Sequence, residues 1–110
     1  MSAILGAVLV VNRFRVPAPE SEGFRADLER ARQALAERPG HVASHVGRNV
    51  DDPTLWTLVT WWRDVGSYRR ALSSYDVKVG AVPLLGRAVD EPSAYESLDG
   101  DLNLARPRET

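Results

Sequence analysis

Apolar and polar residues follow two different periods along this chain, and the changes between them predict its elements. The strongest signal runs from Leu55 to Trp62, where every residue is apolar, aromatic or threonine. This composition is typical of a buried strand. Because side chains alternate across a strand, both of its faces are apolar, with Trp56, Leu58, Thr60 and Trp62 on one and Leu55, Thr57, Val59 and Trp61 on the other.

The period becomes helical at Asp64, directly after this strand. Asp64 can accept a backbone N–H of the next turn as an N-cap, and Val65, Tyr68 and Leu72 then recur on one helical face. A second helical pattern, from Val77 to Ala88, contains a glycine and a proline. We therefore expect a short or broken helix there.

Four further segments complete the pattern. They are a strand from Ala3 to Val16, a helix with Phe24, Leu28, Ala31 and Leu35 on its apolar face, a strand from His41 to Val50, and a strand from Ser93 to Leu98. Pro39-Gly40 ends the helix, since proline restricts the preceding residue and glycine tolerates the turn. The short turn Asp51-Asp52-Pro53, between the strand that ends at Val50 and the strand that begins at Leu55, predicts an antiparallel hairpin.

The predicted order is β-α-β-β-α-β, which indicates an α+β, ferredoxin-like fold with a four-stranded antiparallel sheet and helices on one face. Residues 1–98 form one domain in this reading, and residues 99–110 form a tail that is disordered or lies on a partner. Helices can cover only one face of the sheet, yet the central strand is apolar on both. We therefore predict a homodimer that pairs the open sheet faces.

Composition narrows the choice of partners and location. The 110 residues suffice for one core, and the net charge of -1 gives no reason to expect nucleic acid. The apolar run from Ala3 to Val11 is too short to cross a bilayer and has no basic residue before it, so neither a membrane span nor a signal peptide is predicted. The absence of cysteine fits a reducing cytoplasm, where we expect the protein.

Several common chemistries lack their motifs. His41 and His45 would share a strand face at regular spacing, with Val42 and Val46 on the other face, but their Cα atoms would lie about 13 Å apart. No metal is therefore predicted, and ordinary surface or core roles suit both histidines. The chain also has no phosphate loop, no dinucleotide fingerprint and no GxSxG elbow, which disfavours nucleotide chemistry and hydrolysis.

Polar groups near the central strand are the better candidates. Asn12 ends an apolar run, so it needs either a strand-end contact or a ligand. Trp62 and Tyr68 flank the strand-to-helix joint, where their N–H and O–H could reach one cleft or simply pack in the core. Arg48 lies near the hairpin tip, where a surface role is the simpler reading.

These residues also carry a resemblance. The stretches VVNRFRVP, ERPGHV, LVTWWRDVGSYRRAL and SAYESL, together with Arg48, resemble the antibiotic biosynthesis monooxygenase domain family over roughly Leu9 to Leu98. The resemblance implies a dimeric α+β barrel. It also implies catalytic roles for Asn12, Trp62 and Tyr68, and substrate contacts for Arg48, Leu58 and Trp56, with leucine at position 58 where such members offer asparagine.

Two family activities and one unrelated role remain open. Some members oxidise phenolic aromatic polyketides with O₂ and no flavin or metal, which implies no cofactor and a small aromatic, phenolic or quinone-like substrate. Others degrade haem, but they place a ligating histidine after the second helix, where Tyr75 to Ala88 has none. The third possibility is a non-catalytic dimer that binds a hydrophobic small molecule.

Overall fold

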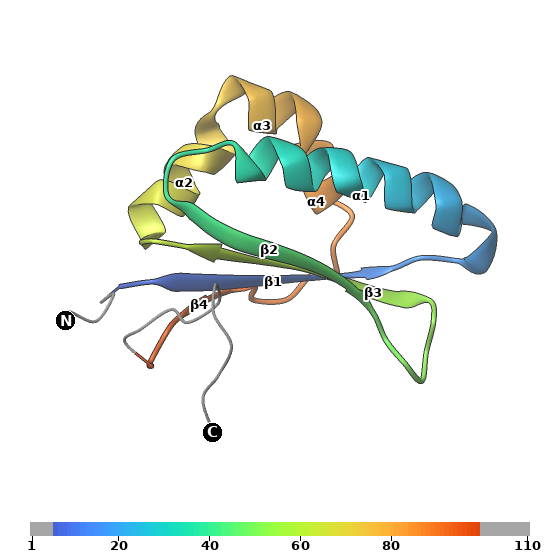
Figure 1. Cartoon of the computed structure of the whole chain (residues 1–110). Coiled ribbons are helices and arrows are strands. Elements are labelled where there is room, and N and C mark those ends of the chain that lie inside the picture. The colour runs from blue at the N-terminus through green and yellow to red at the C-terminus, as the bar shows by residue number, and fades with distance from the viewer. Residues whose placement is uncertain (1–5, 100–110) are drawn as a thin grey trace.

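The computed structural model describes residues 6–99 and shows a four-stranded antiparallel sheet with the helices packed on one face (Figure 1). The strand order β2-β3-β1-β4 and the element order confirm the predicted α+β, ferredoxin-like arrangement. The elements are β1 (Val8–Arg15), the 3-10 helix η1 (Ala18–Glu20), α1 (Ser21–Ala36), β2 (His41–Arg48), β3 (Leu55–Trp62), α2 (Val65–Ser73), α3 (Tyr75–Gly80), α4 (Val82–Leu85) and β4 (Ala94–Glu96).

The joint between β3 and α2 forms as the sequence predicts. β3 spans Leu55–Trp62, and α2 begins three residues later at Val65. The Asp64 carboxylate caps the helix, since its Oδ1 accepts the Ser67 N–H at 2.7 Å. The predicted broken helix is also confirmed, because α3 ends at Gly80 and Pro83 lies in the first turn of a separate α4.

The outer strands are shorter than the sequence suggested. β2 ends at Arg48 because the Asn49 side chain accepts the N–H groups of Asp51 and Asp52, both at 2.8 Å, and so starts the hairpin turn early. β4 covers only Ala94–Glu96 of the predicted last strand. The start of the predicted first strand and nearly all of the predicted tail lie outside the described residues.

An irregularity in β2 changes which way its first residue faces. His41 pairs with Trp62 and Ala43 with Trp61, so the register shifts by one residue at Val42. His41 therefore lies on the helix-facing side with Trp62, whereas His45 lies opposite Val59 on the other side. The expectation that both histidines share a face is wrong, because a bulge inserts one residue into the alternation.

The helix-facing side of the sheet holds the core. Trp62 and Leu58 have no exposed surface, and Trp56 exposes 4%. A close approach of Gly40 to Ser67 tightens this layer, since Gly40 has φ +90° and its backbone lies directly against the Ser67 side chain. The strands contribute Val8, Val10, Phe14, Trp56, Leu58 and Trp62 to the core, the helices contribute Phe24, Leu28, Ala31, Leu35, Ala71, Val77 and Leu84, and Ala81 joins it from the junction between α3 and α4.

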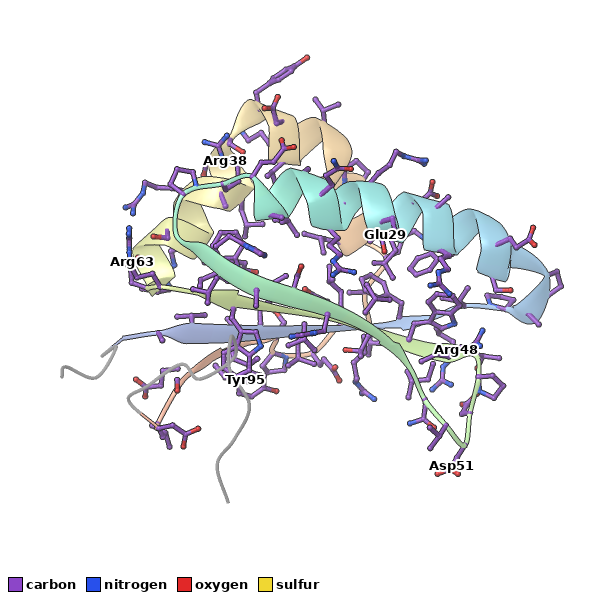
Figure 2. All side chains as sticks on the ribbon, viewed as in Figure 1. Glu29, Arg38, Arg48, Asp51, Arg63 and Tyr95 are labelled. Atoms are coloured by element: carbon purple, nitrogen blue, oxygen red, sulfur yellow. The ribbon has the colours of Figure 1, made fainter. Side chains whose placement is uncertain are left out.

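The opposite side of the sheet has no helix over it in residues 6–99 (Figure 1). Val59 and Trp61 are only half-buried there, and Tyr95 projects from this face and is 51% exposed (Figure 2). Beside Tyr95, a hollow of about 490 Å³ is lined by Leu9 and Val11. None of the described helices has the length and apolar character that a bilayer crossing requires.

Candidate functional site

Three aromatic rings meet where β3 joins α2. The Trp62 ring centroid lies 5.8 Å from that of Tyr68, with the planes tilted by 51°. His41 approaches Trp62 edge-on, at 5.3 Å and 89°. We call His41, Trp62 and Tyr68 the Trp62 cluster. The strand-to-helix joint and the bulge in β2 together bring these residues, which are distant in sequence, to one end of the sheet.

Trp62 is fully enclosed, and its polar atom is occupied. Its indole Nε1–H donates to Thr60 Oγ1 at 2.9 Å, and Thr60 itself is 2% exposed. Both residues point to the same side because they are two apart on β3. In this structure the Trp62 ring is therefore covered on all sides by its neighbours, and its N–H is satisfied within the strand.

Tyr68 is half-buried and remains a hydrogen-bond donor at neutral pH. Burial raises the pKa of its phenol, and a polar contact with the Ser93 side chain opposes that shift. A raised pKa keeps the hydroxyl protonated. Tyr68 can thus donate a proton to a hydrogen bond with an oxyanion.

Asn12 lies four residues along the sheet from the level of Trp62, next to a residue that contacts Ser93. It pairs with Leu58 across the sheet and shares the helix-facing side with Val10. The neighbouring Val11 donates its N–H to the Ser93 carbonyl at 2.7 Å, and the Ser93 side chain contacts Tyr68. Ser93 therefore connects Tyr68 to the part of β1 next to Asn12, which is itself half-buried.

An ion pair helps to hold the segment that carries Ser93. Both nitrogens of one side of the Arg13 guanidinium donate to Glu91, Nε to Oε2 and Nη2 to Oε1, each at 2.7 Å. The N–H of Val89 also donates to the Arg13 carbonyl at 2.7 Å. These contacts fasten the connection between α4 and β4 along β1 and so position Ser93.

His41 is a residue whose setting the sequence did not reveal. Its Nε2 is buried and has no hydrogen-bond partner among the described residues. Burial, followed by the positive charge of Arg32, lowers the pKa of His41. The imidazole is therefore neutral near pH 7 and can accept a proton. The sequence Pro39-Gly40-His41 marks the turn before β2 and could have drawn attention to His41. The side of the sheet to which His41 points, however, depends on the bulge.

The other predicted contact residues lie toward the opposite end of β3. Trp56 is six residues before Trp62, so the two Cα atoms are about 20 Å apart along the strand. Arg48 stacks over Trp56 with 5.5 Å from its guanidinium carbon to the ring centroid, while the Trp56 Nε1–H donates to the Pro53 carbonyl at 3.1 Å. Leu58 is fully buried between the two ends. The six predicted site residues are therefore not brought together: Trp62 and Tyr68 lie at one end of β3, Arg48 and Trp56 lie at the other, and the paired residues Asn12 and Leu58 lie between them.

No group of three or more His, Cys, Asp or Glu side chains that could hold a metal ion occurs in residues 6–99. His41 and His45, on opposite faces of β2, cannot share an ion. What remains at the Trp62 cluster is a packed aromatic group with a protonated phenol and a neutral imidazole, while Asn12 pairs four residues, or about 13 Å, along β3 from Trp62. The phenol can donate to an oxyanion and the imidazole can accept a proton where a ligand reaches them.

Comparisons with known proteins agree on one family. The family model described as "Antibiotic biosynthesis monooxygenase" matches residues 7–81. Among curated proteins, none matches the chain. The solved structures of SnoaB, a cofactor-independent oxygenase from Streptomyces nogalater, are 26% identical in sequence, with TM-scores of 0.72 for a point mutant and 0.71 for a second structure. Each comparison covers 84% of this chain and 93% of SnoaB.

A conserved protein from Methanosarcina mazei Go1 shares the fold at lower identity. It is 21% identical, has a TM-score of 0.70, and the comparison covers 84% of this chain and 94% of that one. Since each comparison covers nearly the whole of the other chain, the similarity extends over one complete domain.

Proposed function

Because this chain belongs to the antibiotic biosynthesis monooxygenase family, we propose that it is a cofactor-independent monooxygenase that oxidises a small phenolic or quinone-like aromatic compound with O₂. The observation that carries the proposal is the Trp62 cluster on a fold shared with a cofactor-independent oxygenase, with Asn12 on the same face of the sheet. We also propose that the protein acts as a homodimer through its open sheet faces.

The proposed reaction needs no external reductant. A phenol loses its proton, and a ring carbon of the resulting anion forms a bond to O₂ and gives a peroxide. Loss of water then leaves a quinone, so that C₆H₆O plus O₂ becomes C₆H₄O₂ plus H₂O for the simplest ring. One oxygen atom enters the product, the other leaves as water, and the substrate supplies all the electrons.

Each residue near the cluster has a role suited to its state. Trp62, which is fully covered in the free protein, would form the wall for a flat ring when the side chains over it move aside, and His41 is the neutral group that can accept the phenol proton. Tyr68 and the Asn12 amide can donate hydrogen bonds to the oxyanion. Donors fixed in this way favour the charged species because they need little reorganisation during the reaction.

Oxygen consumption with a panel of polycyclic phenols and hydroquinones tests this proposal. The purified protein, with a chelator and no added flavin, should consume one O₂ per quinone and incorporate one ¹⁸O atom from ¹⁸O₂. Tyr68→Phe and Asn12→Ala should each lower turnover by about 10- to 100-fold. Tyr75→Phe is the matched control, since Tyr75 is 77% exposed on α3 and should behave as wild type.

The assay also separates the alternatives. Tight binding of phenols without O₂ uptake would refute the enzyme and favour a module that binds hydrophobic molecules. Stoichiometric haem binding followed by ring opening with a reductant would favour the haem-degrading activity. Equal turnover of Tyr68→Phe, Asn12→Ala and wild type would show that the catalytic group lies elsewhere.

A further inference from the structure

A second hollow, separate from the Trp62 cluster, lies between α1 and the hairpin end of β2 and β3. It measures about 190 Å³ and is lined by Arg25, Glu29 and Arg32 of α1 and by Val46, Arg48 and Trp56 of the sheet. Figure 2 shows Glu29 on α1 and Arg48 near the hairpin end of β2. We call this space the arginine hollow.

The arginine hollow has a surplus of positive charge. Three guanidinium groups and one carboxylate line it. Glu29 lies 3.4 Å from Arg32, whose Nε also donates to Ser44 Oγ at 3.1 Å, so this arginine is held by its neighbours. Arg25 and Arg48 take part in no ion pair within residues 6–99, which leaves two positive charges uncompensated beside the same space.

One wall of the hollow is formed by Val46 and by Arg48 stacked on the nearly covered Trp56. Trp56 exposes only 4% of its surface, and its N–H is used by the Pro53 carbonyl, so its ring has a fixed position. Val46 extends this wall. Arg48 stacks on the Trp56 ring at 5.5 Å. A stacked guanidinium is held in place while its N–H groups remain able to bind a carboxylate in a bidentate manner.

We propose that the arginine hollow binds a small planar carboxylate of about the size of benzoate. The carboxylate lies against Arg25 and Arg48, and the flat body lies along Val46 and against the stacked pair of Arg48 and Trp56, of which Trp56 itself exposes only 4%. This site does not depend on the proposed oxygenase activity, because Trp56 and Trp62 are about 20 Å apart on the strand.

An NMR titration of the ¹⁵N-labelled protein tests the site with three probes: benzoate, benzamide and inorganic phosphate. Benzoate should shift the indole N–H signal of Trp56 in a saturable way and leave that of Trp62 unchanged. Benzamide, which has the same shape without the charge, and phosphate, which has charge without the ring, should each bind at least about fivefold more weakly.

Charge-removing variants show which side chains benzoate binding depends on. Arg25→Gln and Arg48→Gln should each weaken benzoate binding by about fivefold, the size of a partly exposed charge contact. Arg69→Gln removes the same charge from an exposed position on α2 and should leave binding unchanged. Glu29→Gln removes the opposing carboxylate and should tighten binding. Thermal melts check that each variant is folded. If Arg48→Gln does not fold, Arg25→Gln still tests the proposal, because Arg25 is an exposed residue.

Four results would overturn the proposal. They are the absence of saturable benzoate binding, equal effects of the Arg25, Arg48 and Arg69 variants, equal binding of benzoate and benzamide, and equal binding of benzoate and phosphate. The last result would show a general anion patch with no place for the ring.

Discussion

The hydrogen bond between Trp62 and Thr60 allows a stringent test of the site's architecture. Thr60→Val removes the hydroxyl that accepts the indole N–H at 2.9 Å and hardly changes the side-chain shape. Both residues are essentially inaccessible, at 0% and 2% exposure, so water cannot replace the lost acceptor. A buried donor without a partner costs about 1–3 kcal/mol. For a domain of this size, that cost lowers Tm by roughly 5–15 °C.

A double-mutant cycle with Trp62→Phe isolates this effect. Phenylalanine has no N–H, so Thr60→Val should cost little in that background, and the coupling free energy should reach at least about 1 kcal/mol. Urea and thermal unfolding provide the measurement, with all four proteins at one concentration because dimerisation would add to stability. A cost below about 0.5 kcal/mol, or the same cost in both backgrounds, would refute the reasoning.

Three further predictions concern the turn before β2, the histidine and the open face. Gly40→Ala should lower Tm strongly, because residue 40 has φ +90° and a Cβ there would lie 2.3 Å from the Ser67 Cβ, and a Tm equal to wild type would contradict this packing. Folding lowers the pKa of His41, so the folded protein holds this imidazole in its neutral form. The stability that the neutral imidazole allows is therefore complete above the unfolded pKa of about 6.5, and it falls as the pH drops below that value. His41→Gln should therefore lose less Tm than wild type between pH 7 and pH 5, and parallel losses would exclude this role. Light scattering at micromolar concentration should give a dimer for wild type and a monomer for Trp61→Asp, whereas a wild-type monomer would refute pairing through the sheet faces.

Local patterns predicted much of the fold. β3 and the Asp64 cap depend on residues close in sequence, and alternation placed Trp56, Leu58, Thr60 and Trp62 on one face, which the structure shows to be the buried one. The end of β2 was misplaced because the Asn49 side chain takes up turn N–H groups, a choice that strand periodicity does not encode.

The candidate site was less predictable because it depends on pairing between strands. The position of His41 follows from a bulge that forms only against β3. The proximity of Ser93 to Tyr68 and Asn12 follows from the packing of a distant segment. Two features could have been predicted from the sequence. Thr60 is two residues before Trp62 on the same face, so it could have been expected to accept the indole N–H, and Trp56 is six positions before Trp62, which puts the two far apart along the strand.

The bulge in β2 decides whether this domain has an interior imidazole. His41 lies opposite Trp62 because one extra residue, Val42, is accommodated between two consecutive pairs. Deleting Val42 would remove the bulge and still leave His41 opposite Trp62, while every pair from Ala43 to Arg48 could keep its partner on β3. A regular pleat that kept Val42 would instead place valine opposite Trp62 and turn His41 to the open face of the sheet, so a change in pairing alone exchanges an interior imidazole for an aliphatic side chain.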